Sequence, residues 1–264
     1  MTIPELRWEP AIHEDPDGGT IVLWPYLPCV RMPASMRPRE WDGLALLCSS
    51  DEIEAMMEEE EQDKRSHGVH VESAAASGTA LGMLVKDLQD LEVGGPAIPD
   101  PEPIRLLHHA QNSRGGMPIY SVIPDLNDEE WANWLSRCAD EQVRIRNLLA
   151  TIGRSKRWAK SRKMAIANIS PSKGADADLG AAATVCAAWW LEERQGMNDE
   201  LISERDVRIA ARLRGALSNL RNSRIDESGT QGAILLAPVQ QAHVPAIEAS
   251  LVACQAVEAM EAEK

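Results

Sequence analysis

The chain has 264 residues, of which 44% are hydrophobic, and carries a net charge of −14 at neutral pH. The length and apolar content are enough for one buried core, with no need for a second domain. The negative charge disfavours a general nucleic-acid-binding or anionic-membrane-binding function, because the mean field of the protein would repel both partners.

The sequence predicts a soluble, cytoplasmic protein. Its first ten residues, MTIPELRWEP, lack the basic and apolar regions of a signal peptide. No apolar run approaches the ~18 residues of a membrane span. The five cysteines are scattered without a CxxC pair, which favours reduced thiols over a disulfide framework.

Two buried strands are predicted in the first half of the chain. Residues 1–19 are polar and predict a loop, and the β-branched and aromatic run at 20–24 predicts a strand that ends at Pro25. A second apolar strand is expected at 42–48. The segments that follow are expected to be an acidic helix at 51–66, a flexible Ser/Ala/Gly-rich stretch at 67–80, an amphipathic helix at 80–91 and a proline-rich loop at 94–103.

The second half is predicted to be mainly helical. The expected elements are a short helix near 103–111, a third strand at 117–123, helices from 127 to about 220, a fourth strand at 232–237 and a helical tail at 244–263. Apolar strands separated by helices predict an α/β fold with a small central sheet flanked by helices. We expect one domain over 1–264, with a helical insertion at about 127–200 between the third and last strands.

One candidate site combines a histidine with a charged helix start. His243 follows the last predicted strand, and open α/β sheets bind ligands beyond the carboxyl ends of their strands. A catalytic interpretation makes His243 a metal ligand or general base, Glu204 or Asp206 its acid/base partner, and Arg205 an oxyanion or carboxylate clamp. The alternatives are a partly buried imidazole bonded to a backbone carbonyl, and an ordinary acidic first turn of a helix.

A second candidate is the basic stretch at 144–173, which runs against the overall charge. It indicates a surface for an anion, RNA or an acidic partner. The alternative is a solvated helix face that neutralises the acidic residues 51–63 or a neighbouring subunit. The candidate anion- or partner-binding residues are Arg154, Lys156, Arg157, Trp158, Lys160, Arg162 and Lys163.

Other motifs argue against a resident metal or cofactor. The chain has no GxGxxG after a strand, no Walker motif, no GxSxG elbow and no HExxH. The histidine pairs at 67/70 and 108/109 lack ligands at zinc-module spacing. The tryptophan pairs at 131/134 and 189/190 favour packing in the core or between helices, or the covering of a subunit interface.

The order of these elements resembles the TraB/Tiki superfamily, which includes erythromycin-esterase-like proteins. Residues 21–24 resemble its first strand, 42–48 its second, 204–206 its ERD-type helix start, and 234–243 its last strand with a histidine. The resemblance implies an α/β fold and metal-dependent chemistry. In the family the first strand ends in GxxH, the second in a glutamate and the last in another GxxH.

This chain departs from the family pattern at each of those positions. The first GxxH is replaced by Pro25-Tyr26-Leu27-Pro28, and the second, Gln240-Gln241-Ala242-His243, keeps only the histidine. Leu46-Leu47-Cys48 stands where the glutamate is expected. Since the family chemistry needs two converging histidines, we expect a non-catalytic binding or assembly subunit that has a protein partner or forms a homo-oligomer.

Two alternatives stay open. One is a divergent metal-dependent hydrolase that uses His243 with Glu204, Arg205 and Asp206. The other is binding of an anion or RNA through residues 144–173, although the overall charge disfavours nucleic acid.

Overall fold

The computed structural model describes residues 2–144, 153–223 and 232–263. Its centre is a five-stranded mixed sheet with strand order β1-β2-β5-β3-β4, in which only β1 is antiparallel to its neighbour. The predicted α/β fold is confirmed. The strands are β1 (Ala11–Glu14), β2 (Thr20–Tyr26), β3 (Gly43–Leu46), β4 (Ile119–Ser121) and β5 (Ile234–Gln240).

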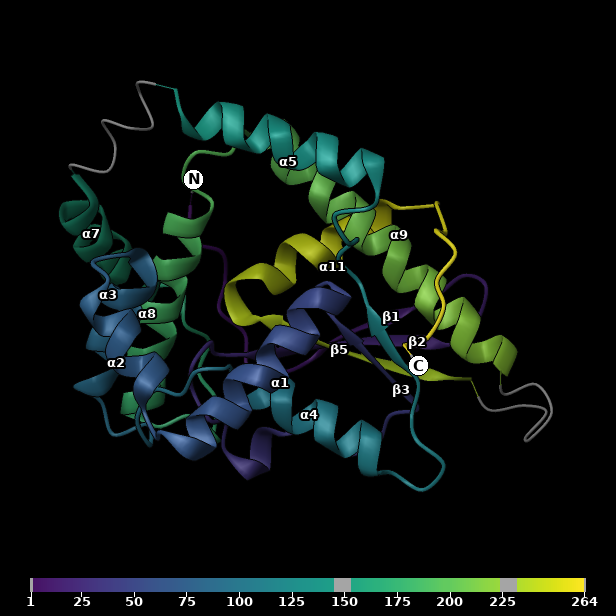
Figure 1. The fold of residues 1–264 in the computed structure, drawn as a ribbon, viewed down its shortest axis with the longest axis horizontal. Helices are drawn as coiled ribbons and strands as arrows, with labels where there is room; N and C mark the ends of the chain where they lie inside the picture. The colour runs from purple at the N-terminus through teal and green to yellow at the C-terminus, as the bar shows by residue number, and fades with distance from the viewer. Residues whose placement is uncertain (1, 145–152, 224–231, 264) are drawn as a thin grey trace.

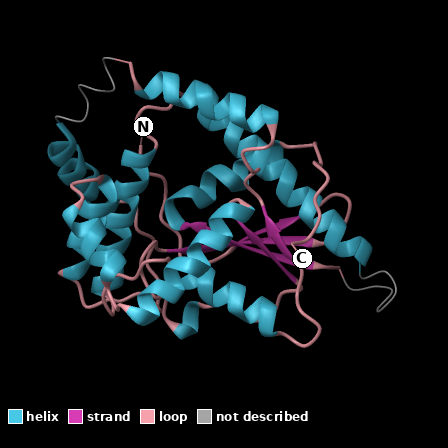
Figure 2. Ribbon diagram, in the orientation of Figure 1, coloured by secondary structure: helices cyan, strands magenta, loops and turns pink. Residues whose placement is uncertain are grey.

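Helices make up most of the remaining structure (Figures 1 and 2). As predicted, a long helical block lies between β4 and β5. None of the helices in the described ranges has the length and hydropathy needed to cross a bilayer. The helices are η1 (Ala34–Met36), α1 (Ser50–Arg65), α2 (Val69–Ala76), α3 (Ala80–Gln89), α4 (Pro101–Asn112), α5 (Glu129–Gln142), α7 (Arg154–Ile166), α8 (Ala177–Glu193), α9 (Asp199–Ser223), η3 (Gln241–His243) and α11 (Val244–Ala253).

The sheet is covered on both faces because its strands are apolar on both sides. Leu44 and Leu236 belong to one apolar cluster, together with residues of α3, α4 and α8. Their strand neighbours Ala45 and Leu235 belong to a second cluster, with residues of α9 and α11. Alternate residues of a strand point to opposite faces, so each cluster fills one face. Figure 1 shows α9 and α11 on one side of the sheet and α1 and α4 on the other.

Both central strands run further than predicted: β2 continues through Pro25, which was expected to end it, and β5 continues through Pro238, beyond its predicted end at 237. Pro25 lies in β2 beyond Leu23, the last β2 residue paired with β1. Pro238 lies in β5 beyond Leu236, the last β5 residue paired with β3. Each proline therefore stands where one neighbouring strand has already ended, and a missing N–H is tolerated at such an edge.

Three further predictions are corrected. The loop expected at 1–19 contains β1, a half-exposed edge strand whose sequence AIHE lacks an apolar run. The stretch expected to be flexible at 67–80 contains α2, which follows α1 after Gly68 in the left-handed region (φ 82°). The tail expected to be helical to 263 leaves the helix at Ala253.

The segment 254–263 instead packs back on the molecule without regular secondary structure. The N–H of Glu258 donates to the carbonyl of Ala211 in α9 at 3.1 Å, and that of Glu263 donates to the carbonyl of Ile119 in β4 at 2.7 Å. Met260 is buried in the apolar cluster under α9. Arg212 binds the Glu258 carboxylate at 2.7 Å. These contacts attach the segment to both α9 and the outer strand of the sheet.

Candidate functional site

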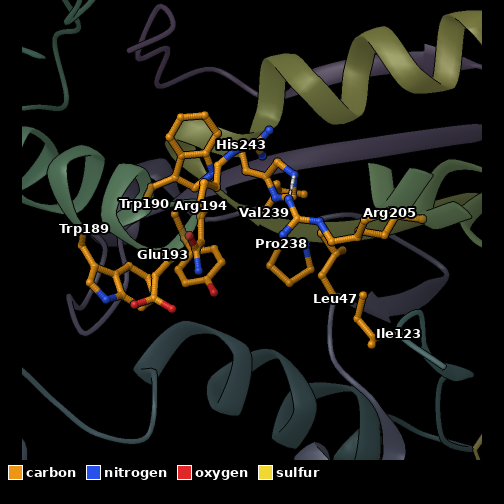
Figure 3. Close-up of a pocket in the computed structure, with 13 residues that line it drawn as sticks. Leu47, Ile123, Trp189, Trp190, Glu193, Arg194, Arg205, Pro238, Val239 and His243 are labelled. Atoms are coloured by element: carbon orange, nitrogen blue, oxygen red, sulfur yellow. Dashed lines mark hydrogen bonds between the residues drawn. The ribbon is translucent and has the colours of Figure 1, made fainter. Parts of the chain in front are cut away.

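A cavity of about 250 Å³ lies at the carboxyl ends of the four parallel strands. Tyr26 at the end of β2, Leu47 after β3, Ile123 after β4 and Pro238 in β5 line its sheet side. Side chains of α8, α9 and His243 form the rest of the wall, as Figure 3 shows. This is the edge at which open α/β sheets bind ligands.

Three of the four residues of the predicted site meet here. Nε2 of His243 lies 2.9 Å from Oδ1 of Asp206 and 3.2 Å from Nη2 of Arg205. Arg205 also donates from Nε and Nη2 to the same Asp206 oxygen, at 3.1 and 3.0 Å. Because an ionised carboxylate only accepts hydrogen bonds, the contact with Asp206 favours a proton on Nε2 and leaves Nδ1 as the basic nitrogen. Figure 3 shows His243 and Arg205 directed toward each other.

The fourth residue, Glu204, does not line the cavity, so of the two predicted acid/base partners only Asp206 contacts His243. The exposed carboxylate of Glu204 accepts two hydrogen bonds from Arg137 of α5, at 2.7 and 3.0 Å. Residues 204 and 206 are two positions apart on α9, and side chains at that spacing point to different faces of a helix. Asp206 faces the cavity side, and Glu204 faces α5.

Arg194, the residue that follows α8, also belongs to the site and was not predicted. Its guanidinium stacks on the ring of Trp190 at 4.5 Å, and that ring lies 6.3 Å from the imidazole of His243. Nη1 of Arg194 is 3.7 Å from Oδ2 of Asp206, which is an ion pair but too long for a hydrogen bond. Trp190 and Arg194 are four residues apart, the helical spacing that brings side chains together, so this signal was present in the sequence.

Two buried N–H donors in the cavity wall lack a hydrogen-bond acceptor among the described residues. Within the described part of the chain, neither Nη1 of Arg194 nor Nε1 of Trp189 has a hydrogen-bond acceptor. Both residues line the cavity. A buried N–H without an acceptor costs about 1–3 kcal/mol, so such groups in a native structure call for an explanation.

Burial sets the protonation of the site. It lowers the pKa of His243, and the nearby Asp206 carboxylate only partly offsets the effect. Burial alone would raise the pKa of Asp206, but the hydrogen bond from His243 and the charges of Arg205 and Arg194 hold it below its usual value. Burial also raises the pKa of Glu193, another residue of the cavity wall. At neutral pH the neutral imidazole of His243 and two guanidinium groups therefore surround the ionised carboxylate of Asp206.

The lowered pKa of His243 should make the protein less stable at acidic pH. The pKa of His243 is lower in the folded protein than in the unfolded chain, where it is about 6.5. The unfolded chain therefore takes up the proton first, and the free energy of unfolding should fall as the pH falls through about 6.5. His243→Gln keeps an N–H for Asp206 and removes the titration. Urea unfolding between about pH 7 and pH 5 should give a flatter profile for the variant, and parallel profiles would contradict the assignment.

The second predicted site does not form one binding surface from all its residues. Arg157 binds Glu192 at 2.8 Å, and Arg162 binds Asp87 at 2.8 Å. Trp158 is buried and donates from Nε1 to the same Asp87, so it packs α7 on α3 and is not a stacking platform. The exposed cations of α7 are Lys156, Lys160 and Lys163, while Arg154 lies 3.7 Å from Glu192. Residues 145–152 of this stretch lie outside the described residues.

The remaining tryptophan pair is structural. Trp131 and Trp134 of α5 stack at 4.4 Å, and Nε1 of Trp134 donates to the carbonyl of Leu201 in α9. This is the predicted packing between helices.

The residues at the strand ends do not fit the metal that the family resemblance implies. His243 and Asp206 contact each other there, and two guanidinium groups flank the carboxylate, which opposes a cation. Over residues 2–144, 153–223 and 232–263, no group of three or more His, Cys, Asp or Glu side chains is placed to hold a metal ion.

No protein-family model, curated protein or solved structure matches this chain. The function therefore has to be inferred from the site itself.

Proposed function

We propose that the protein binds a small anionic ligand in the strand-end cavity and acts there as a non-catalytic binding protein. The observation that carries this proposal is the pair of buried donors, Nη1 of Arg194 and Nε1 of Trp189, which have no acceptor in the described part of the chain. A ligand with carboxylate or phosphate oxygens would supply those acceptors. Both donors would otherwise stay desolvated without a hydrogen-bond acceptor.

The charge of the site supports an anion. Arg194 and Arg205 flank a single buried carboxylate, Asp206, and guanidinium groups bind carboxylate and phosphate with directed, charge-assisted hydrogen bonds. The neutral imidazole of His243 adds no competing negative charge. At about 250 Å³ the cavity lies slightly below the usual range for ligand sites, which suits a small molecule.

Departures from the TraB-like pattern support binding without catalysis. Pro25 and Tyr26 occupy the start of the first GxxH, and it is the tyrosine that lines the cavity at the end of β2. Nε2 of His243 is already engaged by Asp206. The degenerate motifs thus leave a pocket with anion-binding groups and without the second histidine.

Replacing Arg194 with glutamine should weaken anion binding by at least about tenfold, because a hydrogen bond to a charged group contributes about 1.5–3 kcal/mol. We would titrate acetate, succinate, inorganic phosphate and phenyl phosphate into both proteins by calorimetry, and expect a measurable Kd for at least one of them. Arg137→Met is the matched control, since Arg137 is an exposed arginine paired with Glu204 outside the cavity. Equal binding by wild type and Arg194→Gln, or no binding of any of the four anions, would contradict the proposal.

A hydrolase remains the second candidate, and one observation favours it. Asp206 and His243 lie 2.9 Å apart, with a lowered pKa that keeps the imidazole neutral and able to accept a proton. Release of phenol from phenyl phosphate in the same samples, or from phenyl acetate in a separate assay, lost in His243→Gln, would favour this candidate over binding alone.

A further inference from the structure

A second cavity, of about 340 Å³, adjoins the first at the carboxyl ends of the strands. The two cavities share three lining residues, Tyr26, Leu47 and Pro238. The second cavity extends away from α8 and α9, toward α1 and the start of α4. The strand ends therefore carry two adjoining hollows with a common wall.

The second cavity has the opposite charge to the first. Its wall holds the carboxyl groups of Glu52, Glu59 and Asp100, and no lysine, arginine or histidine among the described residues. Asp100 is fixed in place, because it accepts hydrogen bonds from the N–H of Cys29 at 2.7 Å and from the hydroxyl of Tyr26 at 3.2 Å. Burial raises the pKa of Asp100, and the charge of Glu59 raises it further. A cation between these carboxyl groups would relieve that repulsion.

Apolar side chains separate the two charged ends. Leu47 and Pro238 belong to both cavities, and Leu46 and Met56 line the second. Such a wall suits methylene groups. Tyr26 lies between the two cavities, because it lines both of them. Its hydroxyl donates a hydrogen bond to Asp100 of the second cavity.

We propose that the two cavities are the two ends of one ligand site, and that the ligand is a dipolar molecule with an anionic group at one end and a protonated amine at the other. The anionic group of the ligand lies against Arg194 and Arg205, and its amine lies near Glu59 and Asp100. The apolar chain between them lies against the lining residues that the two cavities share. This inference rests on the proposed anion-binding function. It adds that an amine strengthens binding, which an anion pocket alone does not require.

Matched probes test the amine end. Butanoate, hexanoate and octanoate carry only the anion, and 4-aminobutanoate, 6-aminohexanoate and 8-aminooctanoate add the amine at increasing distance. For at least one length, the amino acid should bind at least about fivefold more tightly than its parent acid, while adipate, with a second anion, should bind more weakly than hexanoate. Affinities would be measured by ligand-observed NMR titration of the full chain.

Variants assign each end of the probe to its cavity. Glu59→Gln should abolish the advantage of the amine and leave the Kd of the parent acid within about twofold. Glu58→Gln is the matched control, since Glu58 is the adjacent exposed residue of α1 and does not line the cavity. Arg194→Gln should raise the Kd of the amino acids and of their parent acids by the same factor.

The outcomes separate this inference from the proposed function. If the parent acids bind and no amine improves them, or if Glu59→Gln keeps the full advantage, the dipolar ligand is overturned while the anion pocket stands. If none of these acids binds and the anions of the first experiment also fail, both proposals are overturned.

Discussion

Asp206→Asn should lower the free energy of unfolding by about 3–5 kcal/mol, because Asp206 is a buried carboxylate shared by the buried Arg194, the partly buried Arg205 and His243. The asparagine has nearly the same volume, so the loss reports charge and not packing. Burying Arg194 and Arg205 without Asp206 leaves two like charges close together. Urea denaturation at neutral pH measures the change directly.

Glu204→Gln is the control for this prediction. It removes a carboxylate two residues away on the same helix, whose side chain is 40% exposed and pairs with Arg137. An exposed pair contributes about 0–1 kcal/mol, so this variant should be close to wild type. Equal losses in the two variants would show that Asp206 is not a buried charge centre.

Gly215→Ala should release the segment 254–263 from α9. A Cβ at residue 215 would lie 1.6 Å from the carbonyl oxygen of Glu258, so helix and segment cannot both keep their positions. We expect a loss of about 1–3 kcal/mol in the free energy of unfolding, as for overpacked sites. Limited proteolysis should cut the segment faster in the variant.

The matched control is Gly180→Ala, in helix α8. A Cβ there meets no atom within 4 Å, so the substitution should leave proteolysis unchanged and raise stability by up to about 1 kcal/mol through helix propensity. A Gly215→Ala protein with a segment as protected as in the control would mean that the contact with Glu258 does not hold the segment in place.

Local patterns were enough to predict the four parallel strands and the meeting of His243 with Arg205 and Asp206. Buried parallel strands are continuous apolar runs, and their carboxyl ends gather at one edge, so a histidine beyond the last strand falls at the common site. Strand β1 was not predicted, because an edge strand needs no apolar run. The extension of β2 through Pro25 was missed because tolerance of a strand proline depends on where the neighbouring strands end, which is a property of the assembled sheet.

Other parts of the site depend on long-range packing. That Arg194 reaches Asp206 depends on how α8 lies against α9, and the helical spacing from Trp190 indicates only that these two side chains share a face. The choice between Glu204 and Asp206 was left open, although the helical period already places the two side chains on different faces of the helix. The acidic cavity was missed because it joins residues about 50 positions apart, Glu52 and Asp100, that carry no common motif.

The contact between Glu263 and Ile119 has a consequence for self-association. Strand β4 is the outer strand on its side of the sheet, and an outer strand with free backbone groups is a template on which another chain can add a strand and aggregate. The N–H of Glu263 donates a hydrogen bond to the carbonyl of Ile119 in β4. The Glu263 side chain accepts a hydrogen bond from Ser121, also in β4. The segment that is held on α9 thus also covers the outer edge of the sheet, and its release would expose the backbone groups of β4 to pairing with a strand of another chain.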